Sequence, residues 1–213
     1  MKRKSLVLIG AGGHARVVLD IVRQAAEYTV VGLVDQNPAL HGTTLDGVLI
    51  LGGDDQVGIL RRQGVTDALV AIGDNETRCR LATALVAHGF LLATAVHPKA
   101  TIAPHVSIGA GTVVMASAVV NPGASIGPNA IVNTGATVDH DCTIEECVHI
   151  APGVHLGGGV RVGKLTLIGI GACVVKYKTI GCNVVVGAGA VVIDDIPDRV
   201  LAVGVPARVV RER

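Results

Sequence analysis

The most regular feature of the chain is a six-residue hydrophobic pattern that runs from Val96 to Val192. Every sixth residue in this stretch is Val, Ile or Leu, over seventeen positions without a slip, and we call these residues the anchors. The fourth residue after each anchor is Ala, Val, Thr or Cys, except at Lys178 and Ile196, and Gly, Pro and Asn gather between the pairs. A period of six fits neither a helix nor a plain strand. It is typical of a parallel β-helix, in which each hexapeptide forms one short side of a coil and three sides close the coil.

In such a β-helix the anchors point inward and stack on the anchors of the neighbouring coil. Each coil pairs its backbone with the coils before and after it, so only the two ends of the stack leave unpaired groups. After Val192 the repeat stops, and the tail IDDIPDRVLAVGVPARVVRER is expected to cap the last coil.

The first part of the chain alternates between expected strands and expected helices. The strands are predicted at residues 5–9, 29–34, 48–53 and 67–73, and the helices near 14–26, 55–63 and 75–88. This alternation predicts a small parallel α/β sheet, equivalent to one half of a Rossmann fold. We therefore expect an α/β domain over residues 1–94 and a β-helix with its cap over residues 95–213, with His97-Pro98 near the junction.

Composition narrows the class of protein. The net charge of +1 gives no reason to expect binding to nucleic acid or to a membrane surface, and the basic, apolar start of the chain is broken by glycines too early for a membrane span. Aromatic residues make up only 1% of the chain, which suits thin stacked coils better than a layered globule. The five cysteines show no CxxC spacing, so they are interpreted as small buried thiols of a cytoplasmic protein.

Three loops of the α/β domain are expected to line one crevice, because ligands bind at the carboxyl ends of parallel strands. They are the glycine loop Gly10–His14, the pair Asp35-Gln36, and Gly73–Asn75. Backbone N–H groups at a helix start suit a phosphate, and Asp35 suits a ribose or base donor. The pattern Gly10-x-Gly12-x-x-Ala15 also matches a loose NAD fingerprint. The domain is short and no hydride-transfer site follows it, so a nucleotide joined to another group is favoured over NAD.

The β-helix carries one arrangement with acid–base character. His140-Asp141 falls two and three residues after the anchor Val138, at outward-facing corner positions. A histidine beside a carboxylate is held in one tautomer and made more basic, as a general base requires. Two alternatives stay open: the pair is a solvated surface feature, or His140, His149 and His155 bind zinc between subunits, as in gamma-type carbonic anhydrases.

The two halves together resemble the bacterial sugar O- and N-acyltransferases of surface-polysaccharide synthesis. This family includes sialic acid O-acetyltransferases and the N-acetyltransferases of nucleotide-linked 4-amino sugars. The segments that carry the resemblance span nearly the whole chain: IGAGGHARVV at 9–18, AIGDNETR at 71–78, HPKA at 97–100, VDHDCTI at 138–144, CVHIAPGVHLGG at 147–158, VVGAGAVV at 185–192 and VGVPAR at 203–208.

The resemblance implies a left-handed β-helix and a homotrimer whose active sites lie between neighbouring subunits, with no metal. It implies that His140 is the catalytic base and Asp141 its acidic neighbour. By the same likeness acetyl-CoA, as co-substrate, lies near His149, Gly158, Ile170 and Ala188. The nucleotide sugar lies near Gly12, Gly13, His14, Asp35, Gln36 and Gly73. Gln36 departs from the family pattern, in which an acid can follow the aspartate. The segment Lys176-Tyr177-Lys178 interrupts the repeat, and its two lysines either meet CoA phosphates or form a solvated corner.

The resulting hypothesis is an acetyl-CoA-dependent N-acetyltransferase that acts on a 4-amino-4,6-dideoxy sugar linked to UDP or GDP. The alternatives are an O-acetyltransferase of sialic acid or another sugar hydroxyl, a zinc hydratase, and a non-catalytic trimer that binds nucleotide sugars. The sequence names neither the nucleotide nor the sugar.

Overall fold

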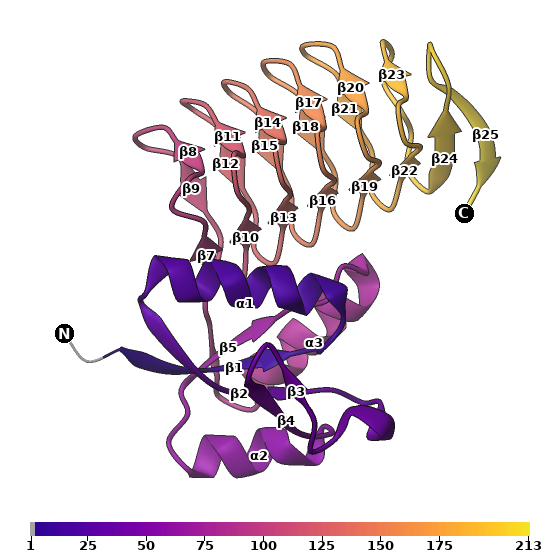
Figure 1. Ribbon diagram of the computed structural model, residues 1–213. Coiled ribbons are helices and arrows are strands. Elements are labelled where there is room, and N and C mark those ends of the chain that lie inside the picture. Colours follow the sequence, from indigo (N-terminus) through magenta and orange to yellow (C-terminus); the bar gives the residue numbers. More distant parts are fainter. Residues whose placement is uncertain (1–2) are drawn as a thin grey trace. The chain divides into compact units, whose positions relative to one another are not determined.

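The computed structural model describes residues 3–213 and divides into two compact units, one ending at Pro98 and one running from Lys99 to Arg213. This division lies close to the expected boundary at residues 94 and 95. The first unit is an α/β sheet with helices and the second is a stack of coils (Figure 1). An α/β domain followed by a left-handed parallel β-helix is therefore confirmed. Among the described residues, no helix is long and apolar enough to cross a membrane.

The first unit is a six-stranded sheet of order β3-β4-β2-β1-β5-β6. Its strands are β1 (Lys4–Ile9), β2 (Tyr28–Val34), β3 (Thr44–Leu45), β4 (Val48–Gly52), β5 (Asp67–Val70) and β6 (Leu91–Leu92), and the short β7 (Ala95–Val96) follows them. Its helices are α1 (Gly13–Ala25), the 3-10 turn η1 (Pro38–Leu40), α2 (Asp55–Arg62) and α3 (Asn75–Ala87). All pairings are parallel except that of β3 with β4, an antiparallel edge that is not among the strands predicted from the sequence.

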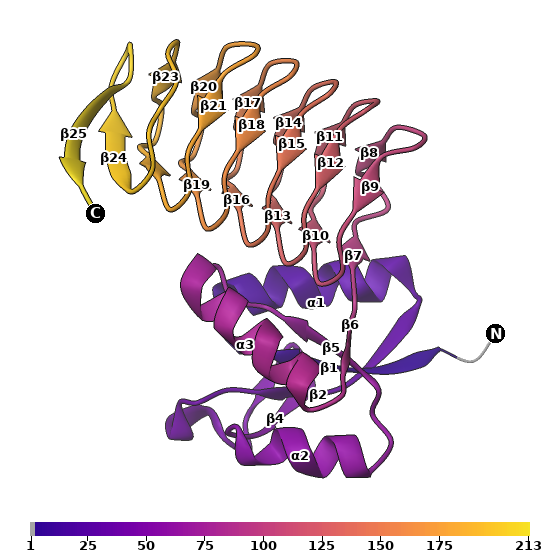
Figure 2. The same ribbon diagram turned by 180° about the vertical axis from the view of Figure 1, so that it is seen from behind.

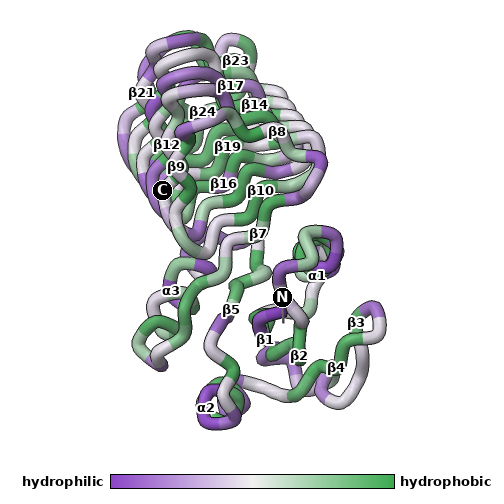
Figure 3. The backbone as a smooth tube through the Cα atoms, turned by 90° about the vertical axis from the view of Figure 1, so that its left-hand side faces the viewer, coloured by the Kyte–Doolittle hydropathy of each residue, from purple (hydrophilic) through white to green (hydrophobic). Residues whose placement is uncertain are grey.

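Helices cover both faces of this sheet. Val7 and Ile9 of β1 share one core with Leu60 of α2 and Leu85 of α3. Helix α1 covers the other face of the sheet (Figures 2 and 3). The alternate residues of β1, Leu6 and Leu8, are fully buried on that side, and the buried residues of α1 include Val18 and Val22. The carboxyl ends of β1, β2, β4 and β5 remain as the common edge at which the loops meet.

The second unit is built from short strands, most of them two residues long, in three sheets whose pairings are parallel apart from the last pairing of the first sheet. The first contains β10 (Val113–Val114), β13 (Ile131–Val132), β16 (His149–Ile150), β19 (Leu167–Ile168), β22 (Val185–Val186), β24 (Val200–Val203) and β25 (Arg208–Glu212). The second contains β8 (Thr101–Ile102), β11 (Val119–Val120), β14 (Thr137–Val138), β17 (His155–Leu156), β20 (Cys173–Val174) and β23 (Val191–Val192). The third contains β9 (Ser107–Ile108), β12 (Ser125–Ile126), β15 (Thr143–Ile144), β18 (Arg161–Val162) and β21 (Thr179–Ile180).

Each strand pairs with the strand eighteen residues later, as Val113 pairs with Ile131 and Ile131 with His149. All anchors from Val114 to Val192 are buried, and they form the hydrophobic columns seen in Figure 3. Ile102 and Ile108 are only half-buried, because their strands lie at the ends of their sheets and pair with one neighbour. The tail continues the stack: β24 pairs with β22, and β25 folds back antiparallel onto β24.

The corners have a conformational rule that the hydrophobic pattern does not express. From residue 105 to residue 189, every sixth residue has a positive φ. Seven of these fifteen positions are glycine, and the others include Asn129, Asn183, Ser117 and Asp141. This left-handed conformation turns the chain from one side of the coil to the next, and it costs an L-residue free energy that glycine does not pay.

Ser117→Gly is therefore expected to raise the free energy of unfolding by about 1 kcal/mol, because Ser117 has a φ of 59°. Ser125, which lies in the extended strand β12, is the matched control. Ser125→Gly is expected to lower stability by about 0.5–1 kcal/mol. Urea denaturation of the two variants tests the rule, and a loss of stability in both would contradict it.

Candidate functional site

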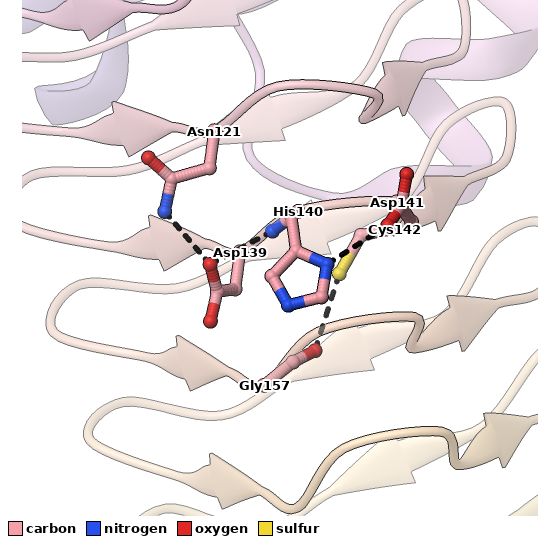
Figure 4. Close-up of polar contacts among 6 residues, drawn as sticks. All are labelled: Asn121, Asp139, His140, Asp141, Cys142 and Gly157. Atoms are coloured by element: carbon pink, nitrogen blue, oxygen red, sulfur yellow. Dashed lines mark hydrogen bonds and ion pairs between the residues drawn. The ribbon is translucent and has the colours of Figure 1, made fainter.

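The corner between β14 and β15 holds the acid–base pair predicted from the sequence (Figure 4). Nδ1 of His140 lies 2.8 Å from Oδ2 of Asp141, and both side chains are at least half exposed. The hydrogen bond to this carboxylate raises the pKa of His140 above its ordinary value of 6.5, since the carboxylate stabilises the imidazolium. With Nδ1 engaged, Nε2 is the nitrogen left to exchange a proton with a ligand.

Asp139 is a part of this corner that the sequence analysis missed. Its Oδ1 accepts a hydrogen bond from Nδ2 of Asn121 and another from the backbone N–H of His140, each 2.8 Å long (Figure 4). The backbone bond, followed by the bond from Asn121, lowers the pKa of Asp139. Asp139 therefore stays ionised and holds the backbone on which His140 is mounted. The motif VDHD contains this acid, but spacing alone does not say which aspartate holds the backbone and which meets the imidazole.

Gly158 lies directly beside the ring of His140. The two residues occupy equivalent corners of successive coils, and a Cβ built on Gly158 would overlap the imidazole, 2.5 Å from its Cε1 atom. The neighbouring Gly159 leaves space in the same way for the ring of Tyr177, one coil further on. The run Gly157–Gly159 is thus a ledge without side chains, on which both rings lie.

The backbone N–H of Gly158 is also available. The carbonyl of Gly158 accepts a hydrogen bond from the N–H of Tyr177, whereas its own N–H has no acceptor within residues 3–213. Gly158 is buried, so this donor is held rigidly beside the imidazole. A buried donor without an acceptor is what a developing oxyanion requires.

The residues predicted to contact acetyl-CoA fall on two different corners of the coil. Ile170 and Ala188 follow β19 and β22, at equivalent corners of successive coils, and both are exposed. Their N–H groups likewise donate to no acceptor in the described part of the chain. His149 lies on β16 of that same sheet, with Nε2 3.1 Å from Nδ2 of Asn133.

His140 and Gly158, in contrast, follow strands of the second sheet. A single chain therefore does not bring the predicted base together with Ile170 and Ala188. Within residues 3–213, no three His, Cys, Asp or Glu side chains converge on a possible metal position, and all five cysteines are free thiols.

In the first unit, the glycine loop leads into α1 without a side-chain cap. Gly12 is the N-cap residue and Gly13 the first residue of the helix, and a Cβ on either would meet no atom within 4 Å. The open N–H groups at this helix start suit a phosphate. Burial and the Arg78 cation lower the pKa of the half-buried His14 to about 4, so this imidazole is neutral near pH 7.

Arg78 is a buried organiser of the third loop that the sequence analysis did not single out. It is 1% exposed, and it donates to the carbonyls of Ile72 and Gly73 and to Oδ1 of Asn75. These bonds shape the loop that holds Gly73. Its place in the segment AIGDNETR does not reveal this role, because burial of an arginine leaves no signal in composition.

Asp35 proves to be a brace for the loops around it. Its Oδ2 accepts from the N–H of Ala11 at 2.8 Å, and its Oδ1 from the N–H of Asn37 at 2.9 Å. The side chain of Gln36 takes no part in this brace, and its Nε2 donates to Oδ2 of Asp54 at 2.8 Å.

A pocket of about 180 Å³ opens at this edge of the sheet. Its lining comes from the ends of β1, β2, β4 and β5 and from α3: Ile9, Gly10, Val34, Asp35, Gln36, Asp54, Ile72, Thr77, Arg80 and Leu81. The sequence predicts Asp35 and Gln36 near this site but does not single out Asp54, Thr77 or Arg80. Gly12, Gly13, His14 and Gly73 do not line this pocket.

Comparisons with known proteins agree with both units. Residues 5–85 match the PglD N-terminal domain family. One similar structure is a His-to-Asn variant of perosamine N-acetyltransferase from Caulobacter crescentus in complex with CoA and GDP-perosamine. Its sequence is 43% identical to this chain and its TM-score is 0.94, over 98% of this chain and 97% of that one. The acetyltransferase domain of PglB from Neisseria gonorrhoeae, in complex with acetyl coenzyme A, is 39% identical with a TM-score of 0.91, over 98% of this chain and 100% of that one.

A further match is short. Galactoside O-acetyltransferase of Escherichia coli K12 is 62% identical over 34 residues, which are 16% of this chain and 17% of that protein.

The stacked hexapeptide coils, with an exposed histidine at a corner, define a hexapeptide-repeat acyltransferase. Within that class the chain belongs to the bacterial sugar O- and N-acyltransferase family, and it is an acetyltransferase.

The ledge beside His140 can be tested with Gly158→Ala. The added methyl group overlaps the imidazole and is expected to push the ring away from Asp141, which lowers the pKa of His140 toward 6.5. We expect acetyl transfer to fall about 10- to 100-fold, since a misplaced group loses most of its catalytic effect. An NMR titration of the His140 ring separates this from simple unfolding, and an unchanged pKa would contradict the ledge's role.

Proposed function

We propose that the chain is an acetyl-CoA-dependent N-acetyltransferase that acts on the amino group of a nucleotide-linked 4-amino-4,6-dideoxy sugar in surface-polysaccharide synthesis. The observation that carries the proposal is the His140–Asp141 pair on a β-helix corner, in a chain that also has an α/β unit with a helix start open to phosphate. A relative with both units, 43% identical, was solved with CoA and GDP-perosamine, and this supports an amino-sugar acceptor.

The reaction begins with a proton transfer to His140. A sugar amine that is protonated cannot attack a thioester, and Nε2 of His140 accepts the proton directly or through a water. The Asp141 carboxylate, bonded to Nδ1, stabilises the imidazolium that results. The amine nitrogen then forms its bond to the thioester carbonyl carbon. As this tetrahedral intermediate collapses, the carbon–sulfur bond breaks, and the CoA thiolate takes up the second proton, which the nitrogen loses as it becomes an amide. The Gly158 N–H supports the carbonyl oxygen while it carries negative charge.

We also propose that the active site forms between subunits of a homotrimer. His140 lies at one corner of the coil, whereas the open N–H groups of Ile170 and Ala188 lie at another. A neighbouring chain that contributes the second corner would complete the acetyl-CoA site beside the first chain's base. Both substrates are cytoplasmic metabolites, which supports a cytoplasmic location.

His140→Ala is expected to lower kcat by about 10²- to 10⁴-fold, the range that a general base supplies, with little change in stability because the side chain is exposed. His105→Asn is the control: His105 is an exposed corner histidine in the first coil, and asparagine tolerates its positive φ. Full activity of His140→Ala in a thiol-release assay would refute the base assignment.

The pH dependence of kcat/KM follows from the raised pKa of His140. The neutral imidazole is the active form, so activity is expected to rise with pH through an inflection above 6.5. Asp141→Asn removes the carboxylate that raises this pKa, and the inflection is expected to move to lower pH while kcat also falls. An inflection that stays in place in Asp141→Asn would show that another group sets it.

The acceptor is tested by CoA-thiol release from acetyl-CoA with 4-amino-4,6-dideoxy sugars linked to GDP, UDP and dTDP. Release is expected with one of these amino sugars. Release only with sialic acid or CMP-sialic acid would indicate an O-acetyltransferase instead. The short match to galactoside O-acetyltransferase is the reason to include these hydroxyl acceptors. Binding of nucleotide sugar without release from any acceptor would favour a non-catalytic trimer.

A further inference from the structure

The pocket at the edge of the sheet contains one carboxylate whose hydrogen-bonding capacity is still open. Asp54 lies between the end of β4 and the start of α2, where an aspartate ordinarily caps the helix. Here it makes no side-chain cap bond. Its Oδ2 accepts from Nε2 of Gln36, and its Oδ1 accepts no hydrogen bond within residues 3–213. The carboxylate is therefore oriented by a side chain and directed away from its own helix.

Asp35 cannot take the same role with the same ease. Both of its carboxylate oxygens already accept backbone N–H groups, from Ala11 and Asn37. Its two backbone bonds fix the orientation of the carboxylate toward its own loops, so it is less free than Asp54 to align with a ligand. Asp54 is exposed, and within the described residues its side chain bonds only to the flexible amide of Gln36.

The rest of the pocket suits a flat heterocycle. Ile9, Ile72 and Leu81 supply apolar walls. The hydrogen-bonded pair Gln36 and Asp54 is part of the polar lining, with Asp35, Thr77 and Arg80. The pocket lies at the carboxyl ends of the parallel strands, where doubly wound sheets bind nucleotides. Apolar walls with a few converging polar groups are the usual composition of a small-molecule site.

The nucleobases differ in what they offer to a carboxylate. Guanine presents two adjacent donors on one edge, N1–H and the 2-amino group, next to the acceptor O6. Uracil and thymine present a single N–H between two carbonyl oxygens, which a carboxylate repels. An aspartate beside an amide donor matches the guanine edge: the carboxylate accepts from both donors, and the second N–H of Gln36 can donate to O6.

We propose that Asp54, oriented by Gln36, recognises the base of the nucleotide sugar and selects guanine. The inference rests on the proposed function, because it takes the ligand of this unit to be a nucleotide. It also gives Gln36 a purpose: an acid at this position would repel the Asp54 carboxylate, whereas the amide holds it.

The test compares GDP with inosine diphosphate, which lacks the 2-amino group, and with UDP, by calorimetric titration of the full-length protein. Wild type is expected to bind GDP about 10- to 100-fold more tightly than inosine diphosphate, the range of one hydrogen bond to a charged group. Asp54→Asn is expected to lose this preference, because the amide cannot accept from both donors. Its affinity for UDP is expected to stay the same or rise.

Asp55→Asn is the matched control. Asp55 is the adjacent acid, its Oδ2 accepts from Gln56, and it does not line the pocket. It removes the same charge one residue away and is expected to keep the preference for GDP. Thermal melting of both variants checks that they fold. A second variant, Gln36→Glu, is expected to weaken GDP binding as well.

The inference is overturned if Asp54→Asn still prefers GDP to inosine diphosphate, or if wild type binds UDP as tightly as GDP. These outcomes are separate from the proposed function. Acetyl transfer to a UDP-linked amino sugar would leave the function standing and remove guanine selection. Tight binding of GDP that depends on Asp54, without acetyl transfer to any amino sugar, would support guanine selection and contradict the proposed function.

Discussion

The pairing of each coil with the coil eighteen residues later is the constraint on which the rest of the second unit depends. The backbone hydrogen bonds of the two-residue strands are satisfied only in this register. The register stacks anchors on anchors, and it also stacks every corner on an equivalent corner. Side chains at the corners therefore meet the residues eighteen positions before and after them. An insertion at any point would shift every later contact at once.

The arrangement around His140 is a direct consequence of that register. The imidazole needs a flat surface on the adjacent coil, and the register assigns this place to Gly158. The same geometry puts Tyr177 over Gly159. A glycine here has two uses: it leaves room for a ring, and its N–H stays available for a ligand. The exposed histidine adds little to stability, so the coil can vary at this corner without loss of its core.

Much of the architecture could be predicted because it is periodic. The six-residue spacing gives the β-helix, its inward anchors and its outward corners, and the strand–helix alternation gives the sheet. The recurring left-handed corners have a weaker signal, since the glycines and asparagines mark many of them but Leu165 and Tyr177 do not. The edge strand β3 is only two residues long, and Thr44-Leu45 has no period to detect.

The site residues were harder to assign because their roles depend on partners distant in the sequence. In each unit one acid near the expected site accepts at least one backbone N–H group, while the carboxylate of a second acid bonds only to a side chain within the described residues. Asp139 fixes the backbone beneath His140, whereas Asp141 holds the imidazole. Asp35 braces the glycine loop through Ala11, whereas Asp54 holds the amide of Gln36.

Residue type cannot separate these roles, because each is set by which donor lies within about 3 Å. An acid that accepts backbone N–H groups is committed to the local fold, since removing its carboxylate would leave those N–H groups without their acceptor. An acid that holds a side chain keeps lone pairs for a ligand and can be exchanged without loss of the loop. The acids of the second kind, Asp141 and Asp54, are therefore the ones through which chemistry and specificity can change while the fold is kept.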